Sequence, residues 1–427
     1  MTAITRPRGT NDILPADAAL WEWLLETHRR VASLHGYDLI EPPVFEATEM
    51  YERGTGAGTD VVEKEMFTFT DRGGRSLTLR PEATPGVVRA VLAAHLDQER
   101  RPVRVRYAGP MFRYAKPQAG RHHEFWQVGI EAIGERSPAL DAEVVEVAWR
   151  FYADLGITGL SLQLNTLGDL DDRLRYRDAL VAYYGPLRDR LCDDCRRRLE
   201  INPLRLLDCR RDAALVAGAP EIGESLGQES REFFAQVAGL LTAAGIPFSL
   251  NPRLVRGLDY YAHTTFELWH ESLQGAQNAL GGGGRYDGLA EVLGFPPTPG
   301  AGYSLGVERT LAVCRIQGLG PEPRRDRIAV LGIGEVGNGA APSIARRLRE
   351  AGIAVLLDSA DRRLDRKLSA AARQGARAVV MVGEDEAAGG TATWKDLDSG
   401  RQETVAIDQL DGALRRLIAG APPSTAA

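Results

Sequence analysis

A break in the sequence pattern at residues 318–326, GLGPEPRRD, limits the folds open to this chain. Proline and glycine cluster there with charged residues, which indicates a linker. After the break, short apolar segments such as RIAVLGI and AVVMVGED alternate with helical patterns such as LDRKLSAAARQGA. This alternation predicts a small α/β domain with a largely parallel sheet. We expect the linker at residues 321–326, the domain at 327–420, and a hairpin that turns at residues 398–400.

Residues 1–320 have a different pattern. Strand-like segments such as PVRVRYAG, LSLQLN and TTFELW are separated by helices and loops of unequal length. This irregular order predicts an antiparallel sheet with helices on one face, an α+β domain. Residues 170–245 have helical spacing throughout, so we expect them to form a helical insertion within this larger domain.

Composition narrows the class of protein. The chain is 44% apolar and 26% charged, as in ordinary globular proteins. Its start, MTAITRPRGTNDILP, lacks the apolar stretch of a signal peptide, and no apolar run is long enough for a membrane span. Only four cysteines occur, which fits a reducing compartment. We therefore expect a cytoplasmic protein with no membrane partner.

Charge leaves the question of nucleic-acid binding open. The net charge is −6, which by itself does not indicate a nucleic-acid partner. Residues 346–377 nevertheless contain nine basic residues against four acidic ones. A solvated helix face is the simpler explanation of this local excess.

A glycine pattern near the start of the second domain resembles a dinucleotide-binding motif. Gly332, Gly334 and Gly337 have G-x-G-x-x-G spacing between a predicted strand and a predicted helix, and Asp358 closes the next strand. Only about 100 residues remain there, which is half of a doubly wound dinucleotide fold. Glycine is also common in such turns for steric reasons alone, and we favour that explanation.

Two patterns suggest metal binding but lack the required ligands. Cys192, Cys195 and Cys209 form C-x-x-C followed by a third cysteine, whereas structural zinc needs four ligands. Reduced structural thiols are expected, although a site completed from elsewhere stays open. His122 and His123 are neighbours, so on a strand they point to opposite faces and cannot bind one ion. We therefore expect no metal site.

The segment FRYAKPQAGRHHEFWQ, residues 112–127, favours an anion site instead. If residues 103–113 and 122–134 form paired strands, Arg113 and Arg121 flank the loop and can converge on one anionic ligand. A solvated hairpin face would explain the segment equally well. Alternation along the second strand places four residues on one face, namely Phe125, Gln127, Gly129 and Glu131.

Four further segments combine charge, glycine and a strand pattern: SLTLRPEATPG, RLVRGLDYYAHTTFE, ALGGGGRYDGL and PGAGYSLGVERT. The run of glycines 281–284 is wasteful in a sheet unless a ligand must lie flat against the backbone. The residues suited to ligand binding in these segments are Arg80, Glu82, Thr84, Arg256, Asp259, Tyr260, Tyr261, Arg285, Asp287, Glu308 and Arg309.

Together these segments resemble the histidyl-tRNA synthetases, a family of class II aminoacyl-tRNA synthetases, over nearly the whole chain. GYDLIEPPVFE is similar to class II motif 1, in which Pro43 implies a dimer interface. Residues 112–127 are similar to motif 2, and GAGYSLGVER to motif 3. LVRGLDYY and GGGGRYDGL resemble the two histidine-specific motifs of the family, and the domain after the linker resembles its anticodon-binding domain.

The resemblance implies a ligase that uses ATP with Mg²⁺ to activate L-histidine and transfers it to the 3′ end of tRNA(His), as a cytoplasmic homodimer. Arg113 and Arg256 would be catalytic, and Arg121 and Arg309 would bind ATP together with Arg113. Lys116 and Gln118 would contact the tRNA acceptor end. The implied histidine-binding residues are Glu82, Ala83, Thr84, Arg113, Gln127, Glu131, Arg256, Tyr260 and Tyr261.

Motif 2 departs from the family pattern at two positions that bear on affinity. Ala115 stands where a glutamate is usual, and His123 where an arginine is usual. We expect an active enzyme with altered affinity for ATP or tRNA. The alternative is a catalytically silent, synthetase-like regulatory subunit of ATP phosphoribosyltransferase that binds histidine. The arginines of motifs 2 and 3 and the C-terminal domain speak against that alternative.

Overall fold

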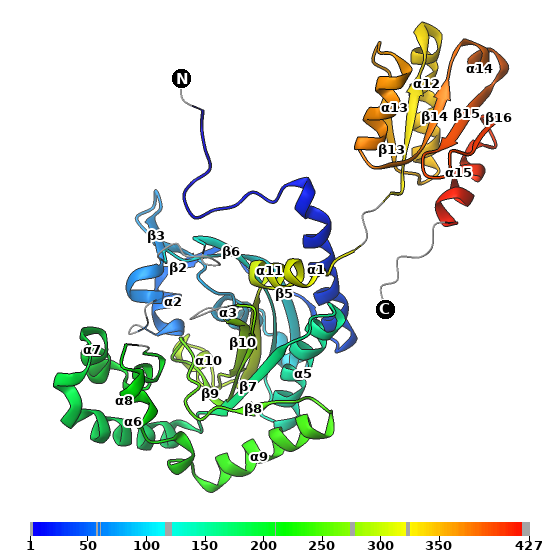
Figure 1. Cartoon of the computed structure of the whole chain (residues 1–427). Helices are drawn as coiled ribbons and strands as arrows, with labels where there is room; N and C mark the ends of the chain where they lie inside the picture. Colours follow the sequence, from blue (N-terminus) through cyan, green and yellow to red (C-terminus); the bar gives the residue numbers. More distant parts are fainter. Residues whose placement is uncertain are drawn as a thin grey trace. The chain divides into compact units, whose positions relative to one another are not determined.

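The computed structural model describes residues 3–56, 59, 61–115, 122–209, 211–273, 278–321 and 325–420. The chain forms two compact units, Met1–Gly320 and Pro321–Ala427 (Figure 1). The boundary falls inside segment 318–326, where the sequence pattern breaks; residues 322–324 of the expected linker lie outside the described residues. No helix in the described ranges is both long and apolar enough to cross a membrane.

The first unit contains an eight-stranded sheet. Its strands are β1 (Asp38–Leu39), β5 (Val103–Phe112), β6 (Glu124–Ile133), β7 (Leu160–Thr166), β8 (Ser249–Leu250), β9 (Ala262–His270), β10 (Ala279–Arg285) and β11 (Gly300–Gly306). They lie in the order β1-β5-β6-β11-β10-β9-β7-β8. Neighbours are antiparallel except at the two edges, where β1 pairs with β5 and β7 with β8 in parallel. The predicted α+β class is confirmed.

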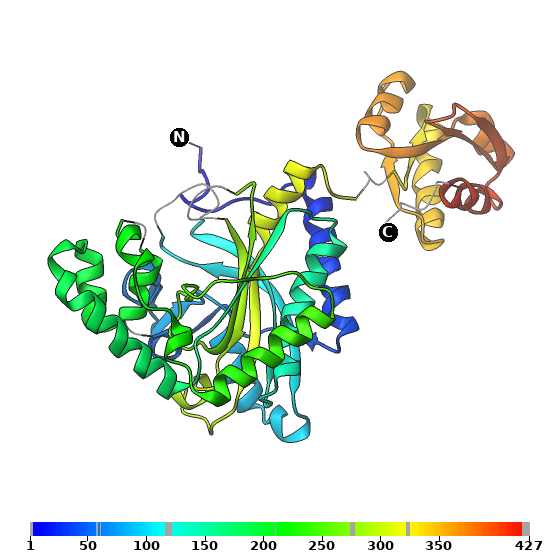
Figure 2. The same cartoon turned by 60° about the horizontal axis from the view of Figure 1, so that its bottom comes forward.

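Four helices cover one face of this sheet (Figure 2). They are α1 (Pro15–Leu34), α5 (Pro138–Asp154), α9 (Gln228–Ala243) and α11 (Val307–Gln317). The start of α5 follows from the local sequence, because the hydroxyl of Ser137 accepts from the backbone N–H of Ala139 at 3.2 Å. Leu24 and Val145 of these helices share a core with the even-numbered β6 residues Val128 and Ile130.

The opposite face is also partly covered, which differs from the expected one-sided arrangement. Helix α3 (Thr84–Ala93) contributes Val87 and Val91 to a second core. Val103 and Val105 of β5 belong to the same core, because every second residue of this strand is buried. The candidate site lies on this face, since the odd-numbered residues of β6 point towards it.

A small second sheet, formed by strands that precede β5 in the sequence, brings the chain to that face of the large sheet. Its strands are β2 (Phe45–Ala47), β3 (Phe67–Thr70) and β4 (Ser76–Leu79), in the order β2-β4-β3. Helix α2 (Thr48–Thr55) packs against this sheet, and a π-helix at Val61–Glu65 and α10 (Leu289–Val292) contact α2. Helix α4 (Leu96–Glu99) contacts α3. The backbone N–H of Phe112 donates to the carbonyl of Arg80 at 2.9 Å. This bond ties the segment after β4 to the end of β5.

The expected insertion at 170–245 is helical, but it divides between the two cores. It consists of α6 (Leu170–Tyr184), α7 (Asp193–Ile201), α8 (Ala213–Ala217), α9 and the 3₁₀ segments Gly185–Arg190, Pro203–Asp208 and Ile222–Glu224. Phe233 and Val237 of α9 belong to the first core, together with α5. Tyr176 and Leu180 of α6 belong to the second core.

The second unit has a five-stranded sheet covered by helices. Its strands are β12 (Arg327–Gly332), β13 (Val355–Asp358), β14 (Ala376–Val382), β15 (Thr391–Asp396) and β16 (Gln402–Ala406), and its helices are α12 (Gly334–Glu350), α13 (Leu364–Arg373), α14 (Glu384–Gly389) and α15 (Leu410–Ala419). Strand β12 pairs in parallel with β13 and β14. The predicted hairpin between β15 and β16 is present, so the sheet is mixed rather than largely parallel.

The glycine pattern of the second unit is explained by packing. Helix α12 begins at Gly334, so part of the pattern lies inside the helix. A Cβ on Gly337 would stand 2.2 Å from the carbonyl oxygen of Val382, and one on Gly332 would stand 2.6 Å from the Cα of Asn338. Only glycine lets α12 approach the sheet this closely, which accounts for the motif without a dinucleotide.

Candidate active site

The face of β6 that carries the odd-numbered residues is the floor of the candidate site. Phe125, Gln127, Gly129 and Glu131 share this face, as the alternation predicts. A Cβ on Gly129 would stand 2.3 Å from the hydroxyl of Tyr107, and one on Gly302 would stand 1.8 Å from Oε2 of Glu131. Glycine is therefore required at both positions for Glu131 and Tyr107 to occupy this floor.

The glycines of β10 have a different explanation from the one expected. All four glycines pair with both β11 and β9, and an added Cβ would meet β11 from Gly281 and Gly283 and β9 from Gly282 and Gly284. A Cβ on any of them would lie between 2.0 and 2.5 Å from a carbonyl oxygen of those neighbouring strands. The run is required for close approach of the three strands, so a ligand lying flat on the backbone is not needed to explain it.

Two buried carboxylates, Glu82 and Glu131, define the site. Glu131 is fully buried and accepts a hydrogen bond from Thr84 Oγ1 at 2.7 Å and another from the hydroxyl of Tyr286. Glu82 is 3% exposed and accepts from Thr55 Oγ1 at 2.7 Å and, on its other oxygen, from the hydroxyl of Tyr260. That second bond, from Tyr260, measures 2.6 Å.

Burial shifts the ionisation of both carboxyl groups. It raises the pKa of Glu131 to about 8, although the hydroxyl groups of Tyr286 and Thr84 favour the charged form. Negative charge on Glu82 raises this pKa further. Burial also raises the pKa of Glu82, against the hydroxyl donors and the nearby guanidinium groups of Arg113 and Arg256. A pocket with this chemistry attracts a ligand that brings N–H donors or positive charge.

The raised pKa of Glu131 predicts how stability depends on pH. The carboxyl ionises near its ordinary pKa of 4.5 in the unfolded chain and near 8 in the folded protein. In this window the folded protein keeps a proton that the unfolded chain has lost, so the free energy of unfolding falls as pH rises. Glu131→Gln lacks this dependence. The melting temperature of the variant relative to the wild type should therefore rise between about pH 5 and pH 8, measured by calorimetry without ligand; parallel curves would contradict the assignment.

Two of the predicted arginines lie beside the carboxylates. Arg113 donates from Nε to the carbonyl of Pro81 at 2.9 Å, and its guanidinium lies 5.4 Å from the ring centre of Phe125. Arg256 forms an ion pair with Glu267, and its guanidinium lies 5.5 Å from the ring centre of Tyr261. Both arginines favour the charged form of Glu82, so positive and negative groups lie close together at this site.

Gln127 adds an unsatisfied acceptor on the same face of β6 as Glu131. Its Oε1 is buried and has no hydrogen-bond partner in the described part of the chain. A buried polar atom without a partner is costly, which points to a ligand that donates a hydrogen bond here. Ala83 is buried between Glu82 and Thr84. Arg121, Lys116 and Gln118, which the sequence assigns to ATP and tRNA, lie outside the described residues.

The adjacent histidines have different neighbours. The ring of His123 stacks on Tyr114 at 4.8 Å and meets the ring of Phe67 edge-on at 5.7 Å. The Nδ1 of His122 lies 3.0 Å from the side-chain amide of Asn11 instead. His123 therefore belongs to an aromatic group with Tyr114 and Phe67, immediately before β6.

Arg309 lies in the first turn of α11. It donates to the carbonyl of Ala279 at 2.7 Å and lines a cavity of about 1090 Å³ together with Trp126, Glu308 and His122. The carboxylate of Glu308 accepts from the backbone N–H of Trp126 at 2.9 Å. Burial raises the pKa of Glu308 to about 7. Glu308 thus joins the first turn of α11, which carries Arg309, to β6.

Some pocket residues had no predicted role, and some predicted ones are structural. Tyr286 and Thr55 donate to the two carboxylates, but only the tyrosine stands in a segment that the sequence singled out. Arg285 is fully buried and pairs with Asp141 of α5 and Asp287. Its guanidinium thus joins β10 to α5 and does not serve as a ligand group.

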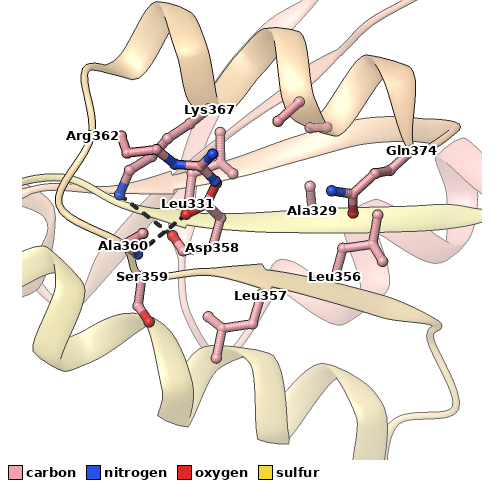
Figure 3. A pocket seen from close by; sticks show the side chains of 12 residues that line it. Ala329, Leu331, Leu356, Leu357, Asp358, Ser359, Ala360, Arg362, Lys367 and Gln374 are labelled. Carbon is pink, nitrogen blue, oxygen red and sulfur yellow. Dashed lines mark hydrogen bonds and ion pairs between the residues drawn. The ribbon is translucent and has the colours of Figure 1, made fainter. Parts of the chain in front are cut away.

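A second cavity, of about 350 Å³, lies in the C-terminal unit between β13 and α13. Figure 3 shows Lys367 and Arg362 directed at Asp358 from α13 and the loop before it. Lys367 is 1% exposed and also donates to the carbonyl of Gly332 and to Oδ1 of Asn338. Its ammonium joins the ends of β12 and β13. The carboxylate that would bind a ribose in a dinucleotide fold is thus paired with Arg362.

Comparison with known proteins supports this organisation. The model of the anticodon binding domain matches residues 327–417. An antiparallel sheet with this polar pocket, followed by such a domain, defines a class II aminoacyl-tRNA synthetase. The model of histidyl-tRNA synthetase matches residues 9–172 and 205–310, which is more than half of the chain. The chain belongs to the histidyl-tRNA synthetase family.

Individual relatives agree over nearly the full length. A histidine–tRNA ligase of Pelotomaculum thermopropionicum is 45% identical over 419 residues, covering 97% of this chain and 98% of its own. One of Halalkalibacterium halodurans is 44% identical and covers 98% and 99%. The structure of apo S. aureus histidyl-tRNA synthetase superposes with a TM-score of 0.83 at 34% identity and covers 97% of this chain and 100% of its own.

Proposed function

We propose that this chain is a histidine–tRNA ligase. The carboxylate of L-histidine attacks the α-phosphorus of ATP, pyrophosphate leaves, and the histidyl group of the adenylate then passes to the 3′ end of tRNA(His). The observation that carries the proposal for the site is the pair of buried carboxylates, Glu82 and Glu131, whose hydrogen-bond donors are hydroxyl groups of neighbouring segments. Histidine is a small ligand that brings both an ammonium group and an imidazole N–H.

The carboxylates divide the recognition of histidine between them. A neutral imidazole has one donor and one acceptor nitrogen, so it needs an acceptor and a donor in the pocket. Glu131 supplies the acceptor, and the hydroxyl of Tyr261 supplies the donor. Glu82, Thr84 and the unpaired oxygen of Gln127 receive the ammonium group. Ala83 and the ring of Tyr260 complete the wall of the pocket.

The arginines position the reacting groups. Arg113 and Arg256 lie near Glu82, where the amino-acid carboxylate must meet the α-phosphate. Two guanidinium groups there align the nucleophile and offset the charge that develops on the phosphoryl oxygens. No side chain acts as a nucleophile. ATP enters as its Mg²⁺ complex, with Arg121 and Arg309 on the outer phosphates.

The remaining assignments concern the larger assembly. Lys116 and Gln118 contact the acceptor end of the tRNA, and the C-terminal unit binds its anticodon. The active protein is a cytoplasmic homodimer, with motif 1 around Pro43 at the subunit interface. These assignments are supported by the motifs and by the family. The contacts in the structure lie within one chain, so they do not bear on a dimer or on bound tRNA.

Two assays on the purified full chain test the function. ATP–pyrophosphate exchange that depends on L-histidine should be measurable without tRNA, and tRNA(His) should then accept labelled histidine. A silent regulatory subunit would bind histidine, as calorimetry can detect, but would catalyse neither reaction. Binding without exchange at millimolar ATP would therefore overturn the proposal. Exchange without charging would restrict it to the first half-reaction.

A further inference from the structure

Four side chains with metal-binding atoms gather in the helical segment, outside the candidate active site. They are Cys192, Cys195, Cys209 and Asp212, and one ligand atom from each lies within 4.8 Å of all the others. Cys192 precedes α7 and Cys195 lies in its first turn, whereas Cys209 follows the 3₁₀ segment Pro203–Asp208. Asp212 immediately precedes α8. Three structural elements therefore meet at this point.

The spacing suits a tetrahedral ion. Zinc bound to thiolates at ~2.3 Å places its ligand atoms ~3.8 Å apart. The sulfur atoms of Cys192 and Cys209 are 3.8 Å apart, and Cys209 Sγ is 3.7 Å from Oδ2 of Asp212. A disulfide would need about 2.05 Å, and all three cysteines are free.

The surroundings also suit a closed site. Cys195 is fully buried in the core that includes Leu191 and Leu206, Cys192 and Cys209 pack against that core, and Asp212 is 9% exposed. The backbone N–H of Cys192 donates to Oδ2 of Asp212 at 3.1 Å, which orients the carboxylate towards the sulfur atoms. Sulfur ligands select zinc over magnesium or calcium. The fourth ligand that the cysteine pattern lacked is an aspartate.

We propose that Cys192, Cys195, Cys209 and Asp212 form a structural binding site for one zinc ion. Four protein ligands leave no open position, so the ion has no catalytic role. It joins α7 to the segment 203–212, whose described residues include the 3₁₀ segment Pro203–Asp208.

The site would stabilise a contact with the histidine pocket. Between the ligands, Asn202 Nδ2 donates to Oδ1 of Asp259 at 2.7 Å, and Arg205 donates to the carbonyl of Gly257 at 2.7 Å. These bonds hold the loop that carries Arg256 and Tyr260. This consequence rests on the proposed function: zinc removal should raise the KM for histidine several-fold in the exchange assay. Zinc content is measured independently of activity, so a failure of the proposed zinc site can be distinguished from a failure of the proposed function.

Metal analysis of the full chain, produced in zinc-supplemented medium and purified without chelators, tests the site. About one zinc per chain is expected in the wild type and in Cys314→Ala, a control that removes a buried cysteine of α11 outside the cluster. Cys209→Ala and Asp212→Ala should lose the ion. A folded wild type with no bound zinc, in which the three cluster thiols and Cys314 all react with an alkylating agent after unfolding, would overturn the proposal. An intramolecular disulfide between Cys192 and Cys209, seen by mass, would overturn it as well.

Cobalt substitution provides a test that does not require removal of a ligand. Co²⁺ in the wild-type site should show sulfur-to-cobalt charge transfer and the visible bands of tetrahedral coordination. In Asp212→Cys the charge-transfer intensity should rise by about one third, because four thiolates replace three. An unchanged intensity would exclude Asp212 as a ligand and overturn the assigned ligand set.

Discussion

Arg256→Gln is expected to lower kcat/KM for histidine in pyrophosphate exchange by about 10²–10³-fold. Arg256 is held by the ion pair with Glu267 and by the ring of Tyr261, so its guanidinium has a fixed position in the pocket. A preoriented positive charge stabilises the developing charge on the phosphoryl group without reorganisation. Arg256→Lys should be nearly as impaired, because an ammonium group cannot reproduce the planar fork. Steady-state exchange rates at varied histidine and ATP measure both variants.

A neighbouring arginine gives the matched control. Arg253 donates to the carbonyls of Val216 and Ala217 in the helical segment and forms an ion pair with Glu221 there. Arg253→Gln should keep exchange within about threefold of the wild type, while thermal unfolding reports any loss of folding. Equal losses in Arg253→Gln and Arg256→Gln, or wild-type exchange in Arg256→Gln, would remove Arg256 from the catalytic groups.

Glu131→Gln is expected to lower kcat/KM for histidine by about 10²-fold or more near pH 8. A carboxylate accepts the imidazole N–H, whereas the amide presents either an acceptor or a donor in a pocket without room to adapt. Burial raises the pKa of Glu131 to about 8, so near neutral pH most of this carboxyl group is protonated in the ligand-free wild type. The ratio of kcat/KM between the wild type and the variant should therefore increase by about tenfold from about pH 6.5 to pH 8.

Tyr286→Phe tests whether Glu131 is the titrating group. The hydroxyl of Tyr286 donates to Oε2 of Glu131 and favours its charged form. Its removal should raise the pKa of Glu131 further and move the rise in kcat/KM to higher pH. A pH profile that is the same in wild type, Tyr286→Phe and Glu131→Gln would show that another group titrates. Comparing variants on the same substrate cancels the ionisation of histidine itself.

The sheet and the floor of the site could be predicted because both depend on local patterns. Alternation along 124–133 places Gln127 and Glu131 on one face of β6, and the hairpin with β5 follows from two neighbouring apolar segments. The helical spacing of 170–245 likewise predicts helices. It could not predict that α9 packs with α5 while α6 joins the second core, because both helices have suitable apolar faces.

The partners of the charged groups depend on contacts between distant segments. The hydroxyl of Tyr260 reaches Glu82 across 178 residues, and Tyr286 reaches Glu131 across 155. The buried partner of Arg285 is Asp141, which lies 144 residues away. Arg285, which the sequence suggests as a ligand-binding residue, is therefore structural. His123 packs against Phe67 and Tyr114 for the same reason.

Residue types and their spacing were therefore enough to predict the class of domain and the segments that carry the candidate site. Tertiary structure alone decided which carboxylates share a pocket, why four glycines follow one another in β10, and that Asp212 stands beside three cysteines. The periodicity of apolar residues depends only on neighbours a few ångströms apart within one helix or strand, so the sequence reveals it. Ionisation and ligand geometry depend on burial and on atoms brought together from several elements, which only the packed fold provides.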